Sequence, residues 1–132
     1  WAMLADIERQ PEWMTEMKSV RVLTPGPIGV GTVCEAEVRI LGISVTDPVT
    51  ITTFEPPMHN AIRHDGSFKG TGTITLESGA DLTTTIVRWQ EQLSPPVLSH
   101  LGALAMTPAL GAIFQADLAR FKELVETGSV AD

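Results

Sequence analysis

The sequence predicts an α+β fold in which a meander of antiparallel strands is covered by one long C-terminal helix. The helix is predicted over Thr107–Gly128, because apolar residues recur there at spacings of three and four, as on one face of an amphipathic helix: Leu110, Phe114, Leu118, Phe121 and Val125. Thr107 suits the N-cap, Pro108 the first helical position, and Gly128 the position just after the helix. A single long helix after such strands is expected to pack across their sheet.

Six strands are predicted before this helix. Thr32–Leu41 alternates cleanly, with Glu35, Glu37 and Arg39 on the face opposite its apolar residues, so one face of this strand is expected to be wet. Turn residues such as Asp65-Gly66 separate the later strands. The six predicted strands are Lys18–Leu23, Thr32–Leu41, Val45–Phe54, Met58–Asp65, Phe68–Leu76 and Leu82–Leu93.

The remaining segments are predicted to be short helices and loops. Trp1–Asp6 reads as a short helix, and Gln10–Met14 reads as a second one with Pro11 at its start. The loop at Thr24–Gly31 is rich in proline and glycine. Pro48 is expected to mark a bulge or a sheet edge, and Gly70 and Gly72 are expected to let the sheet curve. Val97–Met106 is ambiguous between a lid, a loop and a short helix.

Length and composition restrict the classes of function. A chain of 132 residues is expected to form a single domain, residues 1–132. The net charge of −7 argues against nucleic-acid partners and anionic membrane surfaces. The single Cys34 favours a reducing compartment, so we expect a cytoplasmic protein. No apolar run is long enough to cross a membrane, and the first residues lack the basic region of a signal peptide. The chain has no start methionine, so its native N-terminus is left open.

Several segments in this order carry a family resemblance: Leu4–Glu8, Pro11–Met14, Gly26–Thr32, Phe54–Pro57 and Phe121–Glu126. With them the chain resembles the START/Bet v 1-like (SRPBCC) superfamily, and in particular its bacterial polyketide cyclase/dehydrase-like branch. The resemblance implies a helix-grip fold, in which a curved antiparallel sheet wraps around the C-terminal helix and an apolar cavity lies between them. It also implies that two short helices close one end and that a first strand is missing upstream of Trp1.

Motifs for most kinds of catalysis are missing. The glycines of Gly26–Gly31 precede a predicted strand, whereas a phosphate-binding loop precedes a helix. His59, His64 and His100 lack the spacing of metal ligands, and His59 and His64 are expected on opposite faces of one strand. Cys34 lies on the apolar side of its strand and reads as a small hydrophobic residue. We therefore expect no metal and no cofactor.

Proton-transfer chemistry inside a cavity stays open. The ionisable candidates on strands each favour an outward, solvated position: Asp47, Arg63, His64, Arg88 and Glu91. Glu91 has one argument against that position. If the apolar Trp89 points inward, strand geometry turns Glu91 inward as well, where it would need a partner. On the C-terminal helix, Gln115 and Asp117 are expected to face water.

The resemblance and the apolar helix face together favour a small-molecule binding protein. Its ligand would be hydrophobic, such as a lipid, a polyketide or a similar metabolite. One alternative is a polyketide cyclase, aromatase or dehydratase, and another is a protein-interaction module that uses an apolar patch at Val97–Met106. The sequence does not decide among these, nor the oligomeric state. The expected ligand-binding wall comprises Trp13, Ile40, Ile51, Phe68, Trp89, Met106, Leu110, Phe114 and Leu118.

Overall fold

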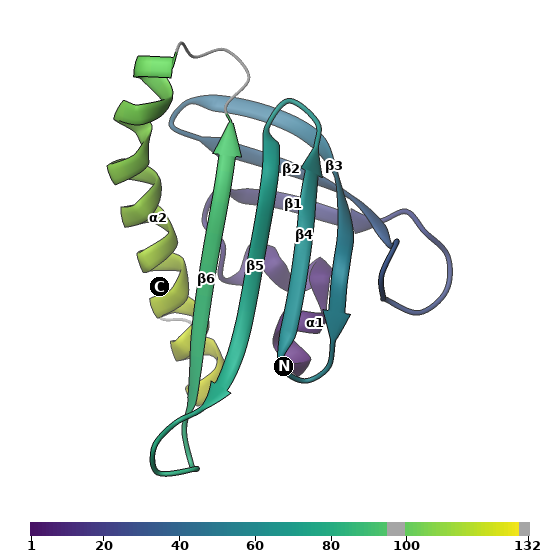
Figure 1. Cartoon of the computed structure of the whole chain (residues 1–132), viewed down its shortest axis with the longest axis vertical. Helices are drawn as coiled ribbons and strands as arrows, with labels where there is room; N and C mark the ends of the chain where they lie inside the picture. The colour runs from purple at the N-terminus through teal and green to yellow at the C-terminus, as the bar shows by residue number, and fades with distance from the viewer. Residues whose placement is uncertain (95–99, 130–132) are drawn as a thin grey trace.

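The computed structural model describes residues 1–94 and 100–129, with side chains described for all of these except 100–106. Six antiparallel strands follow one another in chain order across one sheet, and a long helix runs back alongside the last of them (Figure 1). The strands are β1 (Met17–Val22), β2 (Val33–Ile40), β3 (Ile43–Glu55), β4 (His59–Asp65), β5 (Lys69–Ser78) and β6 (Thr85–Ser94). All six predicted strands are therefore present, with shifted ends.

The C-terminal helix, α2, spans His100–Thr127 and so begins seven residues before Thr107. The predicted N-cap at Thr107 and first position at Pro108 are therefore wrong, and Pro108 lies inside the helix. The preceding stretch, residues 101–106, is rich in alanine, leucine and methionine, which favour helix and outweigh the local start signal. The predicted end is confirmed: Gly128 has φ +81°, and its N–H donates to the Leu124 carbonyl at 2.9 Å.

Two short helical segments precede the sheet, as predicted. The first is α1 (Ala2–Ala5), and the second is a 3-10 helix, η1 (Ile7–Glu12). The second begins earlier than the predicted Gln10, and Pro11 lies inside it rather than at its start. So short a segment has few N–H groups with helical partners, so Pro11 removes little hydrogen bonding there. Directly after η1, the Trp13 side chain is buried between the sheet and α2.

The sheet curves at positions that sequence patterns located only in part. The register of β3 against β4 shifts between Ile51 and Thr53, whereas Pro48 pairs in regular register with Glu35. Pro48 therefore marks no bulge, but it lies just outside the pairing of β3 with β4, which begins at Val49, as the alternative of a sheet edge allows. Gly70 has φ +140°, and a Cβ there would collide with the Gln92 carbonyl. Glycine is thus required at this close approach of β5 to β6.

Among the described residues, apolar side chains between the sheet and the helices form three clusters. The first, here called the packed end, comprises Leu4, Trp13, Met14, Phe121 and Leu124. A second lies under β1 to β3 and contains Cys34, Ala36 and Ile51. The third joins Ile40 and Phe68 to partly buried residues that include Leu110 of α2. The candidate site lies among these three clusters. Within the described part of the chain, no helix is long and apolar enough to cross a membrane.

Candidate functional site

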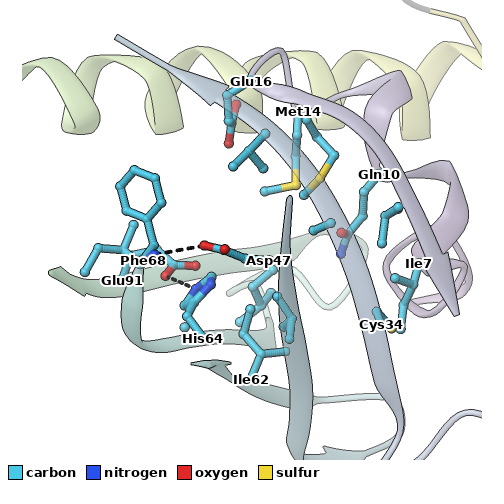
Figure 2. Close-up of a pocket in the computed structure, with 18 of the residues that line it drawn as sticks. Ile7, Gln10, Met14, Glu16, Cys34, Asp47, Ile62, His64, Phe68 and Glu91 are labelled. Atoms are coloured by element: carbon cyan, nitrogen blue, oxygen red, sulfur yellow. Dashed lines mark hydrogen bonds and ion pairs between the residues drawn. The ribbon is translucent and has the colours of Figure 1, made fainter. Parts of the chain in front are cut away.

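A pocket of about 110 Å³ lies on the inner face of the sheet (Figure 2). Side chains from η1, from all six strands and from α2 contribute to its wall. Six of the nine expected wall residues line it: Trp13, Ile40, Ile51, Phe68, Trp89 and Phe114. The rings of Trp89 and Phe114, with centroids 4.6 Å apart, join β6 to α2 at the pocket wall.

The other three expected residues have different positions. Leu110 packs against the cluster of Ile40 and Phe68. Leu118 is half-buried on α2 and is not among the described lining residues. Met106 lies outside the described side chains, as does the candidate interaction patch at Val97–Met106. The two leucines share a helix face with Phe114, but a stripe on a helix is wider than the part that reaches one pocket.

Most of the remaining wall is aliphatic. These aliphatic residues occupy the strand positions whose side chains point inward. For β2, the alternation within Thr32–Leu41 already indicated which positions these are. Burial raises the pKa of the Cys34 thiol, which is consistent with an inert, small hydrophobic residue. The further apolar lining residues are Ile7, Met14, Met17, Val20, Cys34, Ala36, Val38, Val49, Ile62, Ile74 and Leu93.

Asp47 is a buried carboxylate in this wall, with 7% of its surface exposed. Its Oδ2 accepts a hydrogen bond from the backbone N–H of Phe68 at 2.8 Å. Gly66 makes room for it, because a Cβ at Gly66 would overlap the Asp47 side chain. The expected outward position of Asp47 is therefore wrong. Gly66, in the turn between β4 and β5, and the backbone N–H of Phe68 together allow the Asp47 carboxylate to lie inside.

His64 and Glu91 form a second polar feature of the wall, and Figure 2 shows them beside Asp47. His64 Nε2 lies 3.1 Å from Glu91 Oε2, and the Trp89 indole N–H donates to Glu91 Oε1 at 2.8 Å. The two strands concerned, β4 and β6, are separated by β5, where Gly72 leaves the space that the Glu91 carboxyl occupies. The inward turn of Glu91 and its need for a partner, both expected from Trp89, are thus confirmed.

The five ionisable candidates are therefore divided between the two faces of the sheet. Asp47, His64 and Glu91 face the pocket. Arg63 lies on the outer face, where its Nε is 2.5 Å from Asp65 Oδ1. Arg88 Nε likewise lies 3.5 Å from Glu77 Oε2. His59 also points away from His64, as the strand period predicted, and lies 3.4 Å from Glu55. In the described part of the chain, no three metal-ligating side chains gather in a group that could hold an ion.

Two further acidic residues were missed by the sequence reasoning. Asp117 is fully buried at 0% exposure, so its expected water-facing position is wrong. Its Oδ1 accepts hydrogen bonds from the N–H and the hydroxyl of Thr15, both at 3.0 Å. The available signal was its place on the helix, three residues after Phe114 and four before Phe121, which is the apolar face itself.

Glu16 lies next to Thr15 and lines the pocket with only 6% of its surface exposed. Burial raises the pKa of Glu16 to about 8, and the neighbouring Asp117 and Glu91 add to the effect. At neutral pH this group therefore holds its proton. No periodic pattern marked Glu16, because it lies in the short connection between η1 and β1.

Comparisons with known proteins agree with this architecture. The sequence matches the family described as polyketide cyclase/dehydrase and lipid transport over residues 1–126. The crystal structure of DR_A0006 from Deinococcus radiodurans is similar to this chain with a TM-score of 0.72 and 21% identity, and the match covers 96% of this chain and 86% of that one. The crystal structure of Ara h 8.0201 is similar with a TM-score of 0.56 and 14% identity, over 88% of this chain and 82% of that one.

Among curated proteins, the search found no significant match. The two solved structures are each less than 25% identical, so they support the fold alone. The family assignment rests on the match that spans nearly the whole sequence. This chain belongs to the polyketide cyclase/dehydrase and lipid transport family and has its Bet v 1-like helix-grip fold.

Proposed function

We propose that this protein binds a small, mainly apolar molecule in the pocket between its sheet and α2. The observation that carries the proposal is the wall itself, where Ile40, Ile51 and Phe68 line the same pocket as the Trp89–Phe114 contact. Pockets with apolar walls and a few oriented polar groups are the usual sites for small molecules. Here Asp47, His64 and Glu91 supply such polar groups.

The volume of the pocket limits the size of the ligand that it can hold. A volume of about 110 Å³ is well below the ~300 Å³ at which drug-sized sites begin. It is closer to a known dry cavity of about 150 Å³ that takes up benzene. A molecule with one ring therefore fits the pocket as it stands, whereas a whole lipid or polyketide requires the wall to move. Met14 and Met17 are flexible wall residues that allow some movement.

Intrinsic fluorescence offers a direct test, because Trp13 and Trp89 both line the pocket. We expect one-ring compounds such as cyclohexanol to change the tryptophan emission saturably. The variant Ala36→Leu adds bulk at a buried wall position and should abolish the change, whereas Ala80→Leu adds the same bulk at an exposed position and should not. Native mass spectrometry of the purified protein would identify a co-purified molecule. Absence of binding by any apolar compound tested would contradict the proposal.

A cyclase or dehydratase activity is the second candidate, favoured by the pair of His64 and Glu91 in the pocket wall. Ring closure of a keto compound begins when a base removes a proton from the carbon next to a carbonyl group. The imidazole of His64 could accept that proton, and the Glu91 carboxylate would stabilise the resulting imidazolium. Trp89 holds Glu91 in place through its indole N–H.

Proton exchange at carbon tests this second candidate apart from simple binding. In D₂O near neutral pH, the wild type should accelerate deuterium uptake at the α-carbons of cyclohexanone, as followed by NMR. His64→Gln should lose this acceleration, whereas His59→Gln changes a histidine outside the pocket and should keep it. Exchange at the buffer rate in all three proteins would leave binding as the function and remove catalysis.

A further inference from the structure

The acids of the pocket wall are not balanced by basic residues. Asp47 and Glu91 line the pocket beside the protonated Glu16, and the side chain of Glu91 is only 9% exposed. The described lining residues include no lysine and no arginine. His64 is the lining residue that can become positive, and its Nε2 already lies against Glu91. A molecule that enters the pocket therefore meets buried acids without an unpaired cation.

One oxygen atom in this wall is also free to bond a ligand. Asn60 Oδ1 is buried and has no hydrogen-bond partner among the described residues, whereas the protonated carboxyl of Glu16 is hydrogen-bonded to that of Asp117. Asn60 lines the pocket. A buried polar atom without a partner costs about 1–3 kcal/mol, so a donor group from a ligand would recover part of that cost.

The state of Glu16 points in the same direction. Burial is the main cause of its raised pKa, followed by the hydrogen bond that its protonated form makes with Asp117, and the negative charges of Asp117 and Glu91 add to the effect. These surroundings thus favour a proton over a carboxylate at this position. The same surroundings would oppose the negative charge of a ligand.

We propose that the pocket selects ligands that bring a hydrogen-bond donor and no negative charge, namely small cyclic alcohols and amines, and that it excludes carboxylates and phosphates. This inference rests on the proposed binding function and names its ligand class. An anion would give up its hydration for a site without a free cation, which is strongly unfavourable. It would also be repelled by Asp47 and Glu91, and such repulsion is several times stronger at a buried site than in water.

The experiment compares ligands of one shape that differ in a single group. Cyclohexanol, cyclohexylamine and cyclohexanecarboxylate are titrated into the wild type at pH 7 and followed by calorimetry and tryptophan fluorescence. The alcohol and the amine, which is a cation at this pH, should bind at least about tenfold more tightly than the carboxylate. Equal or tighter binding of the carboxylate would overturn the inference while leaving the binding function intact. Binding by none of the three would contradict both.

Two matched variants test whether the wall acids cause the selectivity. Glu91→Gln removes one charge from the pocket wall, and Glu37→Gln removes the same charge from the exposed face of β2. Glu91→Gln should narrow the gap between alcohol and carboxylate by about tenfold, whereas Glu37→Gln should leave it unchanged. If Glu91→Gln does not fold, Asp47→Asn takes its place. An unchanged gap in a folded wall variant would overturn the inference.

Discussion

The two ends of the space between the sheet and α2 are filled in different ways. At the packed end, Trp13 has ring centroids 4.9 Å from Phe121 and 5.9 Å from Trp89, and none of its surface is exposed. At the other end, inward positions are occupied by Asp47 and Glu91, each lying over a glycine. Close aromatic packing leaves little room for a ligand, whereas buried acids beside glycines leave space and cost stability. We therefore expect stability to depend mainly on the packed end and the proposed binding mainly on the other end, with Trp13 and Met14 contributing to both as part of the pocket wall.

The largest expected effect comes from breaking the packed end. Trp13→Ala should lower the free energy of unfolding by about 3–5 kcal/mol, because it leaves a large void among Phe121, Trp89 and Leu4. Urea denaturation monitored by circular dichroism measures this loss. Val30→Ala, at an exposed position, should change stability by no more than about 0.5 kcal/mol. Similar losses in the two variants would contradict the assignment of stability to this end.

A pH titration of stability tests the protonation of Glu16, which lines the pocket and neighbours Asp117. Because its folded pKa is about 8 and its ordinary value is 4.5, the folded protein keeps a proton that the unfolded chain releases between these values. The free energy of unfolding should therefore fall as pH rises through this window, by at most about 1.4 kcal/mol per pH unit. Glu16→Gln should flatten this dependence, and Glu37→Gln should not. A slope that persists in Glu16→Gln would assign it to another group.

Gly72→Ala tests the cavity end directly. A Cβ at Gly72 would overlap the Glu91 carboxyl and push it away from His64, at a cost of about 1–3 kcal/mol. The indole N–H signal of Trp89 in NMR should shift, since that group donates to Glu91. The control is Gly29→Ala, where an added Cβ meets nothing within 4 Å. An unshifted Trp89 signal in a destabilised Gly72→Ala would show that Glu91 keeps its position.

Much of the fold could be predicted because its signals are local. The alternation of Thr32–Leu41 fixed the inner and outer faces of β2, and the glycine at 128 marked the helix end. The start of α2 could not be predicted in the same way. Thr107 and Pro108 form a genuine start signal, but helix-favouring residues before them extend the helix through it. The curvature of the sheet likewise depends on a register shift near Thr52, which no proline or glycine marks.

Most of the apolar wall was predicted from the sequence, but among the polar residues of the site only Glu91 was given an argument for an inward position. Trp89 fixed the direction of Glu91 through strand parity, and that prediction is confirmed. The same parity was available for Asp47 and His64, since Val49 lies two positions after Asp47 and Ile62 lies two positions before His64, but the polar character of both residues was given more weight. Asp117 was assigned to water by its charge, although its spacing placed it on the apolar face. Periodicity therefore indicated the buried positions of these polar residues, and their polar character argued wrongly against it.

The smallest expected effect concerns the part of α2 near the third cluster, where Gly111 lies between Leu110 and the exposed Ala112. An added Cβ at Gly111 would meet nothing within 4 Å, so Gly111→Ala should stabilise the protein by about 0.5–1 kcal/mol through helix propensity alone. Urea denaturation measures the gain, and cyclohexanol binding should stay the same. Weaker binding in this stabilised variant would mean that ligand entry requires this part of α2 to loosen. The difference between the packed end and the proposed binding end would then extend to α2.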